Sequence, residues 1–138
     1  MKNLKMILFF GALLLTAFTF NASAQEDKMK SDKMTSKPTV ALIRADWCSA
    51  CKKVEPIIND LMQSYGGKVN LVVLDVTSDE TTAQAEATAK SHGLSSFFEA
   101  NKKSTSTVGI FKNKREVFKT THNSDRETYA QAFAKATK

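Results

Sequence analysis

Two short apolar runs, residues 39–45 and 68–76, stand out along the chain because polar residues bound each of them. Both are rich in β-branched side chains, and continuous apolar runs of this length are typical of strands buried in a sheet. Between them, residues 49–65 carry apolar side chains at helical spacing, and Gly66-Gly67 supplies a stop signal. This pattern predicts a β-α-β unit with parallel strands and a right-handed crossover.

The next segment changes to a polar pattern. Residues 79–92 predict a second helix that Gly93 closes. Residues 94–103 are ambiguous, and the pair Phe97-Phe98 is expected to fill the core beneath a short helical turn or loop. Pro56 lies inside the first helix, where its missing N–H predicts a kink.

Strand-like patterns return in residues 107–112 and 115–121, which flank the dipeptide Asn113-Lys114. Asn tolerates the positive φ of a tight hairpin turn, whereas Lys tolerates it less well. We therefore predict a β-hairpin near the end of the chain.

The last helix is predicted to start at Ser124, which would form a capping box with Glu127. Its buried face would carry Tyr129, Ala130 and Phe133. The resulting order is β-α-β-α-β-β-α within one domain, residues 38–138. We predict an α/β fold with a four-stranded mixed sheet that has helices on both faces.

The first 24 residues combine a basic start, an apolar run at Met6–Phe20 and a small-x-small end. This is the pattern of a cleaved secretory signal peptide, and the run is shorter than the roughly 20 residues of a membrane-spanning helix. Cleavage removes Lys2 and Lys5 and no acid, which lowers the formal charge from +6 to +4. So small a surplus does not indicate nucleic-acid binding. Residues 25–37 are charged and poor in large apolar groups, which predicts a flexible polar linker.

Both cysteines of the chain, Cys48 and Cys51, lie where the first strand gives way to the first helix. The free N–H groups and positive dipole end at a helix start favour an anion. The pKa of Cys48 is therefore expected to lie below the roughly 8.5 of a free thiol. Lys52 and Lys53 would add a small, screened contribution. We expect Cys48 at the exposed edge and Cys51 tucked against the helix, where it resolves a mixed disulfide formed at Cys48.

Three other roles for the cysteine pair stay open. A structural disulfide fits an oxidising compartment, but a loop across two residues constrains the unfolded chain very little. A zinc or iron–sulfur site needs about four ligands, and only His92 and His122 stand out as further ones. The third role is a module that binds a partner and keeps an inert disulfide. The spacing favours redox exchange without a metal or an organic cofactor.

Residues 45–76, ADWCSACKKVEPIINDLMQSYGGKVNLVVLDV, resemble the active-site strand, helix and following strand of the thioredoxin superfamily. Residues 107–119, TVGIFKNKREVFK, are similar to the terminal hairpin of that family. The resemblance implies a compact thioredoxin-like fold and a thiol-disulfide oxidoreductase in which Cys48 attacks and Cys51 resolves. It also implies that Trp47 shields the site and contacts the substrate, although a packing role for Trp47 is the alternative.

Two departures from the family pattern bear on function. The family has a cis-proline just before the hairpin strand, facing the cysteines, and this chain has Thr105 or Ser106 in that place. With Thr107, this segment is the one that the resemblance implies for backbone contacts to the substrate. Leu42 stands where many thioredoxins carry a buried acid that handles the proton of the resolving cysteine. Leucine cannot do this, which predicts slower turnover.

These observations together predict a secreted, periplasmic thiol-disulfide oxidoreductase. Its partners would be protein thiols and disulfides, together with a redox partner that could be membrane-bound. We expect a monomer. The alternative is a non-catalytic binding or chaperone-like module that could hold a metal on its thiols. The direction of electron flow depends on the reduction potential of this pair relative to that of its partners.

Overall fold

A computed structural model describes residues 37–138. The strands are β1 (Thr39–Arg44), β2 (Asn70–Asp75), β3 (Thr107–Lys112) and β4 (Arg115–Thr121). The helices are α1 (Cys51–Tyr65), α2 (Asp79–Ser91), α3 (Ser95–Asn101) and α4 (Arg126–Ala136). The predicted signal peptide, residues 1–24, lies outside the described residues, as does all of the predicted linker, residues 25–37, except Lys37.

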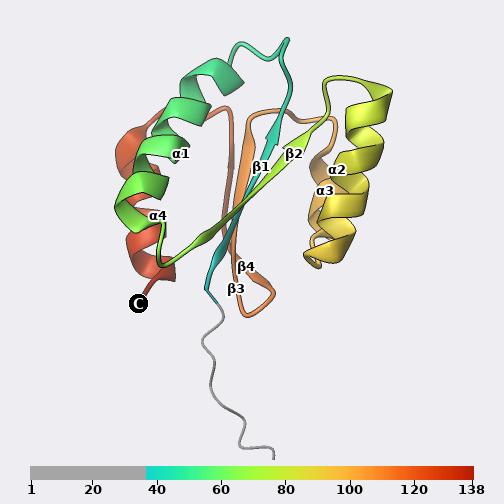
Figure 1. Ribbon diagram of the computed structural model, residues 1–138. Helices are drawn as coiled ribbons and strands as arrows, with labels where there is room; N and C mark the ends of the chain where they lie inside the picture. Colours follow the sequence, from blue (N-terminus) through green and yellow to red (C-terminus); the bar gives the residue numbers. More distant parts are fainter. Residues whose placement is uncertain (1–36) are drawn as a thin grey trace, which may run out of the picture. The chain divides into compact units, whose positions relative to one another are not determined.

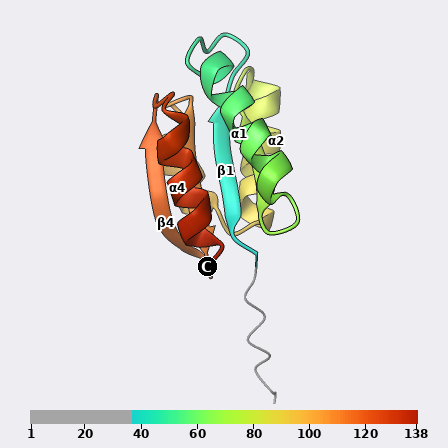
Figure 2. The same cartoon turned by 90° about the vertical axis from the view of Figure 1, so that its left-hand side faces the viewer.

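The four strands form one mixed sheet in the order β2-β1-β3-β4. Strand β1 pairs parallel with β2, while β3 pairs antiparallel with both β1 and β4. Helices α1 and α4 cover one face, and α2 and α3 cover the other (Figure 1). Figure 2 shows α1 and α4 side by side, and the two helices are in contact. The predicted fold class is confirmed.

Strand β1 is central to both hydrophobic layers because successive side chains of a strand point to opposite faces. Val40 and Leu42 pack with α1 and α4, whereas Ala41 and Ile43 pack with α2 and α3. All four side chains are buried. This two-sided burial explains why the strand reads as a continuous apolar run.

The ambiguous segment after Gly93 is helix α3, and it buries Phe97 and Phe98 against the sheet. The Phe97 ring lies so close to Gly109 in β3 that a Cβ at that glycine would come within 2.7 Å of it. Phe97 also packs edge-to-face with Phe111. The expectation that the phenylalanine pair fills the core is confirmed.

The hairpin strands have the predicted bounds, and both turn residues, Asn113 and Lys114, have positive φ. Two predicted helix starts are wrong. Helix α1 begins at Cys51 and not at residue 49. Helix α4 is capped by Asp125 and not by Ser124, because the Asp125 carboxylate accepts hydrogen bonds from the N–H groups of the second and third helical residues. Helix α1 continues through Pro56, and the kink stays a prediction.

Candidate redox site

Three loops meet at one edge of the sheet. Strands β1 and β2 are parallel, and β4 runs in the same direction as β1 because both are antiparallel to β3. The segments that follow these three strands, residues 45–50, 76–78 and 122–125, therefore lie at the same edge. This edge carries the cysteine pair.

Cys48 and Cys51 form a disulfide with Cα atoms 5.3 Å apart. The Cys51 N–H donates a hydrogen bond to the Cys48 sulfur at 3.0 Å. Ala50, at the N-cap position of α1, offers no side-chain cap, so the Cys48 sulfur takes the place of a capping oxygen. The first sulfur thus sits at the positive end of the α1 dipole, as predicted.

The prediction that Cys48 lies at an exposed edge is wrong. Only 5% of Cys48 is exposed, although its neighbours Trp47 and Ser49 are both exposed. In the disulfide with Cys51, the Cys48 side chain turns inward. There the two cysteines pack with the buried Ala45 and with the partly buried Ala50 and Val76. Cys51 is fully buried, as expected.

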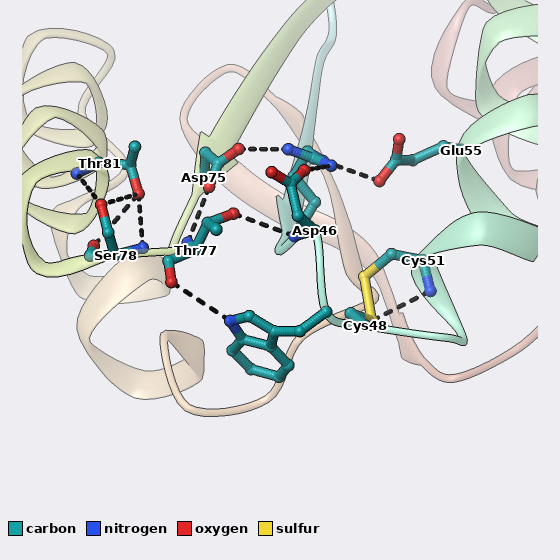
Figure 3. Close-up of polar contacts among 10 residues, drawn as sticks. Asp46, Cys48, Cys51, Glu55, Asp75, Thr77, Ser78 and Thr81 are labelled. Atoms are coloured by element: carbon teal, nitrogen blue, oxygen red, sulfur yellow. Dashed lines mark hydrogen bonds and ion pairs between the residues drawn. A yellow bond between two sulfur atoms is a disulfide. The ribbon is translucent and has the colours of Figure 1, made fainter.

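A charged cluster adjoins the cysteine loop at the ends of β1 and β2. The Arg44 guanidinium donates to a carboxylate oxygen of Asp75, to Asp46 at 2.5 Å and to Glu55 at 2.8 Å, as the dashed lines in Figure 3 show. Arg44 and Asp75 are register partners across the parallel strands, and Glu55 lies one turn of α1 beyond Cys51. The cluster ties the two strand ends to the active-site helix.

The hydrogen bonds of the cluster shift the pKa values of two of its groups. The side chain of Glu55, followed by that of Asp46, raises the pKa of Arg44 above its ordinary value. Burial opposes ionisation of Asp75, but hydrogen bonds from Thr77 and Arg44 outweigh it and lower the pKa of Asp75. One guanidinium facing three carboxylates leaves a formal charge of about −2 on this side of the disulfide.

Thr77 links the cluster to Trp47. The Thr77 hydroxyl accepts the Asp46 N–H at 3.0 Å, its carbonyl accepts the Trp47 indole N–H at 3.3 Å, and its own N–H donates to Asp75 at 2.8 Å. The side chain of Trp47 is held this way while 65% of the residue remains exposed. A packing role for Trp47 therefore does not fit, and its ring is presented to solvent beside the disulfide.

The segment Thr105–Thr107 is buried just before and at the start of β3. Ser106 donates its N–H to the Ile43 carbonyl at 2.8 Å, and its own carbonyl accepts the His122 N–H at 3.2 Å. Its φ is 62°, and its hydroxyl has no hydrogen-bond partner among the described residues. Both backbone groups of Ser106 are thus engaged within the protein, and substrate binding by this segment stays a prediction.

Sequence reasoning missed Arg44, Asp46, Glu55, Asp75 and Thr77. One signal for the cluster was present, because Arg44 and Asp75 carry opposite charges at the ends of two strands predicted to be parallel. Within residues 37–138, no group of three or more His, Cys, Asp or Glu side chains is arranged to hold a metal ion. None of the helices in this part of the chain is long and apolar enough to cross a membrane.

Solved structures share this fold at low sequence identity. Thioredoxin O2 from Arabidopsis thaliana, in its oxidised state, has a TM-score of 0.55 at 19% identity, with 75% of this chain and 77% of that chain covered. The thioredoxin of Malassezia sympodialis has a TM-score of 0.52 at 21% identity, with 74% and 79% covered. The architecture of the described residues is therefore the thioredoxin fold.

Sequence comparison gives the family. Thioredoxin C-2 of Corynebacterium nephridii is 36% identical over 59 residues, which are 42% of this chain and 55% of that protein. The thiol:disulfide interchange protein TxlA homolog of Synechocystis is 36% identical over 44 residues, 32% of this chain and 24% of that protein. The chain spans about half or less of the length of these curated relatives. The thioredoxin family model matches residues 17–123, and the chain belongs to the thioredoxin family.

Proposed function

We propose that this protein is a thiol-disulfide oxidoreductase that exchanges disulfides with protein substrates through Cys48 and Cys51. The observation that carries the proposal is the disulfide at the start of α1, where the Cys51 N–H donates to the Cys48 sulfur. A sulfur in this position gains stabilisation as a thiolate from the helix N–H groups and dipole. The printed name of the Synechocystis relative, a thiol:disulfide interchange protein, supports the same chemistry.

The exchange balances as two displacements on sulfur. The Cys48 thiolate attacks a substrate disulfide, forms a mixed disulfide and expels one substrate thiolate. The Cys51 thiol then loses its proton to water and attacks the Cys48 sulfur, which closes the protein disulfide and expels the second substrate thiolate. Two electrons pass from the protein dithiol to the substrate disulfide, and each departing thiolate takes up a proton. The same steps in reverse oxidise a substrate dithiol.

Leu42 bears on the second displacement. Its side chain is buried between the sheet and helices α1 and α4, where it contributes no group that could accept the Cys51 proton. We therefore retain the proposal that resolution is slow. Leu42→Asp, compared with the parent in the rate of resolution of a Cys48 mixed disulfide, tests it, and no gain in rate would contradict it.

We further propose that the protein works after export, in the periplasm. The support is the pattern of the first residues: a basic start, the apolar run Met6–Phe20 and a small-x-small end before Gln25. Its redox partner would then lie in the same compartment or in the membrane beside it. Mass spectrometry of the protein recovered from cell fractions tests this directly, and a chain recovered uncleaved from the cytosol would contradict it.

The activity test uses insulin as the disulfide substrate and a small dithiol as the electron donor. We expect the protein to accelerate insulin reduction, Cys48→Ala to abolish the acceleration, and Cys51→Ala to accumulate a mixed disulfide with substrate. The Arg126→Met variant, altered at an exposed ion pair with Asp60, serves as a control that keeps the activity. Absence of acceleration by the parent protein would contradict the proposal.

One observation favours a second candidate, a binding module with an inert disulfide. Cys48 is only 5% exposed, so a substrate sulfur has little access to it in the oxidised state. If the dithiol donor leaves the Cys48–Cys51 bond intact under native conditions, this second candidate replaces the oxidoreductase. Rapid reduction of the same bond excludes it.

A further inference from the structure

A small cavity lies beside the disulfide. Its volume is about 190 Å³, and it lies between the start of α1 and the loop that follows β4. The two residues between the cysteines form part of its wall. The full lining is Ser49, Ala50, Lys53, Val54, His122 and Ser124.

The polar side chains that line the cavity are suited to an anion. Lys53, His122, Ser49 and Ser124 can each donate a hydrogen bond, and no lining residue is acidic. Across the described part of the chain, the side chains of Lys53 and His122 form no ion pair or hydrogen bond. The neighbouring acid Asp125 is already engaged, because its carboxylate accepts hydrogen bonds from the start of α4.

The opposite flank of the disulfide has the reverse charge. There the cluster of Arg44 with three carboxylates carries a formal charge of about −2, and Asp46 is exposed. A carboxylate that approaches the disulfide is repelled on the Trp47 side and attracted on the Lys53 side. Both flanks therefore favour the orientation that places a substrate carboxylate on the Lys53 side of the disulfide.

His122 is held at the rim by its backbone. Its N–H donates to the Ser106 carbonyl, and its φ of 55° lies in the left-handed region, which an L residue adopts at a cost. This anchoring fixes the place from which the imidazole projects. A cationic or donating side chain on each wall gives the cavity two separate contacts for one carboxylate.

We propose that this cavity is a substrate subsite for an acidic side chain, Asp or Glu, adjacent to the reactive cysteine of a protein disulfide. The proposal deepens the proposed function, on which it rests, by naming a substrate class. The bound carboxylate accepts hydrogen bonds from Lys53 and His122 while the neighbouring substrate sulfur faces Cys48. Substrates with such an acid form the mixed disulfide faster than neutral or basic ones.

The kinetic test uses the full chain reduced with a dithiol and then desalted. It reacts in single turnover with symmetrical peptide disulfides that carry Glu, Gln or Lys next to the cysteine. We expect the Glu peptide to react about threefold faster than the Gln peptide, the gain typical of a solvent-accessible ion pair, and the Lys peptide to react slowest. Lys53→Gln and His122→Asn should each bring the Glu to Gln ratio towards one. Asn is chosen at position 122 because it tolerates positive φ.

Lys52→Gln is the matched control. It removes the same charge one residue away on α1, and Lys52 does not line the cavity. The Glu to Gln ratio should stay at the parent value in this variant. Equal loss in Lys52→Gln and Lys53→Gln would overturn the proposal, since the preference would then come from the general field of the surface.

A binding measurement tests the subsite independently of the proposed oxidoreductase activity. The oxidised full chain is titrated by calorimetry with the same peptides after their cysteine is replaced by serine, so that no exchange takes place. Tighter binding of the Glu peptide than of the Gln peptide, lost in Lys53→Gln, supports the subsite even if insulin reduction fails. Equal binding of the two peptides, or equal reaction rates with active protein, overturns it.

Discussion

Ser106 and Thr107 are adjacent buried residues whose hydroxyls have opposite environments. The Thr107 hydroxyl donates to the Ser104 carbonyl at 2.6 Å and lies 2.9 Å from the Thr121 hydroxyl. The Ser106 hydroxyl has no partner among the described residues, and its backbone adopts a φ of 62°. A buried hydroxyl without a partner loses its hydrogen bonds to water and gains none within the protein, which lowers the free energy of unfolding. Its carbonyl accepts the N–H of His122, which lines the cavity next to the cysteine loop, and an unsatisfied residue with positive φ at such a place is a sign of a functional constraint.

We predict opposite effects of removing these two hydroxyls. Ser106→Ala should raise the free energy of unfolding by about 1 kcal/mol because it removes an unsatisfied buried polar group. Thr107→Val should lower it by about 1 kcal/mol because it breaks satisfied hydrogen bonds. Urea unfolding of both variants beside the parent measures the difference. Destabilisation by Ser106→Ala would mean that its hydroxyl has a partner, such as a water or a bound group.

At the scale of elements, the Arg44 cluster joins the ends of β1 and β2, helix α1 and the loop that follows β2. Arg44→Met would leave the carboxylates of Glu55 and Asp75 without a positively charged partner while each is about two-thirds covered. We predict a loss of about 2 kcal/mol in the free energy of unfolding. The loosened Asp75 and Thr77 should also release the indole of Trp47.

Trp47 reports this release because it is the single tryptophan of the chain. In Arg44→Met its emission should change in the native state, and the reduction potential of the disulfide should fall, because the cluster becomes more negative and destabilises the Cys48 thiolate of the reduced form. Arg126→Met is the control, since both members of its ion pair with Asp60 are more than half exposed and the pair contributes under about 1 kcal/mol. An unchanged potential and emission in Arg44→Met would contradict a link between the cluster and the site.

The elements that could be predicted from the sequence are those set by local pattern. The hairpin was predicted with its observed bounds because two strand patterns flank Asn113-Lys114, which provide the positive φ values of its turn. Helix α3 stayed ambiguous because its seven residues are too few for a stable helix on their own, and packing of Phe97 over Gly109 holds it.

The site was predictable only in part for the same reason. The cysteine spacing is local, so the disulfide and its place at the start of α1 could be predicted. The burial of Cys48 and the cluster around Arg44 depend on residues up to 31 positions apart that only the folded sheet brings together. The cap at Asp125 was missed because Ser124, one residue earlier, offers an equally good local signal.

For the molecule as a whole, Tyr129 makes the free energy of unfolding depend on pH in the alkaline range. Burial raises its pKa to about 12, and its hydroxyl donates to the Asn123 carbonyl at 2.6 Å. In the unfolded chain a tyrosine ionises near pH 10. The stabilisation is therefore complete below pH 10 and is lost as pH rises towards 12, at up to about 1.4 kcal/mol for each pH unit.

Tyr129→Phe isolates this contribution from that of the lysines. The variant should be less stable by about 1 kcal/mol at pH 7, where the hydrogen bond is missing. Its loss of stability between pH 10 and 12 should be smaller than that of the parent by about 2 kcal/mol. Urea unfolding at several pH values measures both, and parallel pH profiles of the two proteins would contradict the prediction.

The redox state and the stability of the whole domain form one thermodynamic cycle. This cycle distinguishes a disulfide that takes part in exchange from a structural disulfide. Closing a loop of about four residues constrains the unfolded chain by only roughly 2 kcal/mol. In the reduced protein, the Cys48 sulfur can still accept the N–H at the start of α1, which stabilises the native state.

We therefore predict that the reduced domain unfolds cooperatively in urea, with a free energy of unfolding within about 2 kcal/mol of the oxidised value. The Cys48→Ser/Cys51→Ser variant, which lacks both sulfurs, gives the reference. Each 1.4 kcal/mol of difference between the two redox forms corresponds to about 30 mV between the reduction potentials of the folded and unfolded chains. A domain that unfolds when the disulfide is reduced would identify the bond as a structural staple and would leave the exchange cycle without a folded dithiol form.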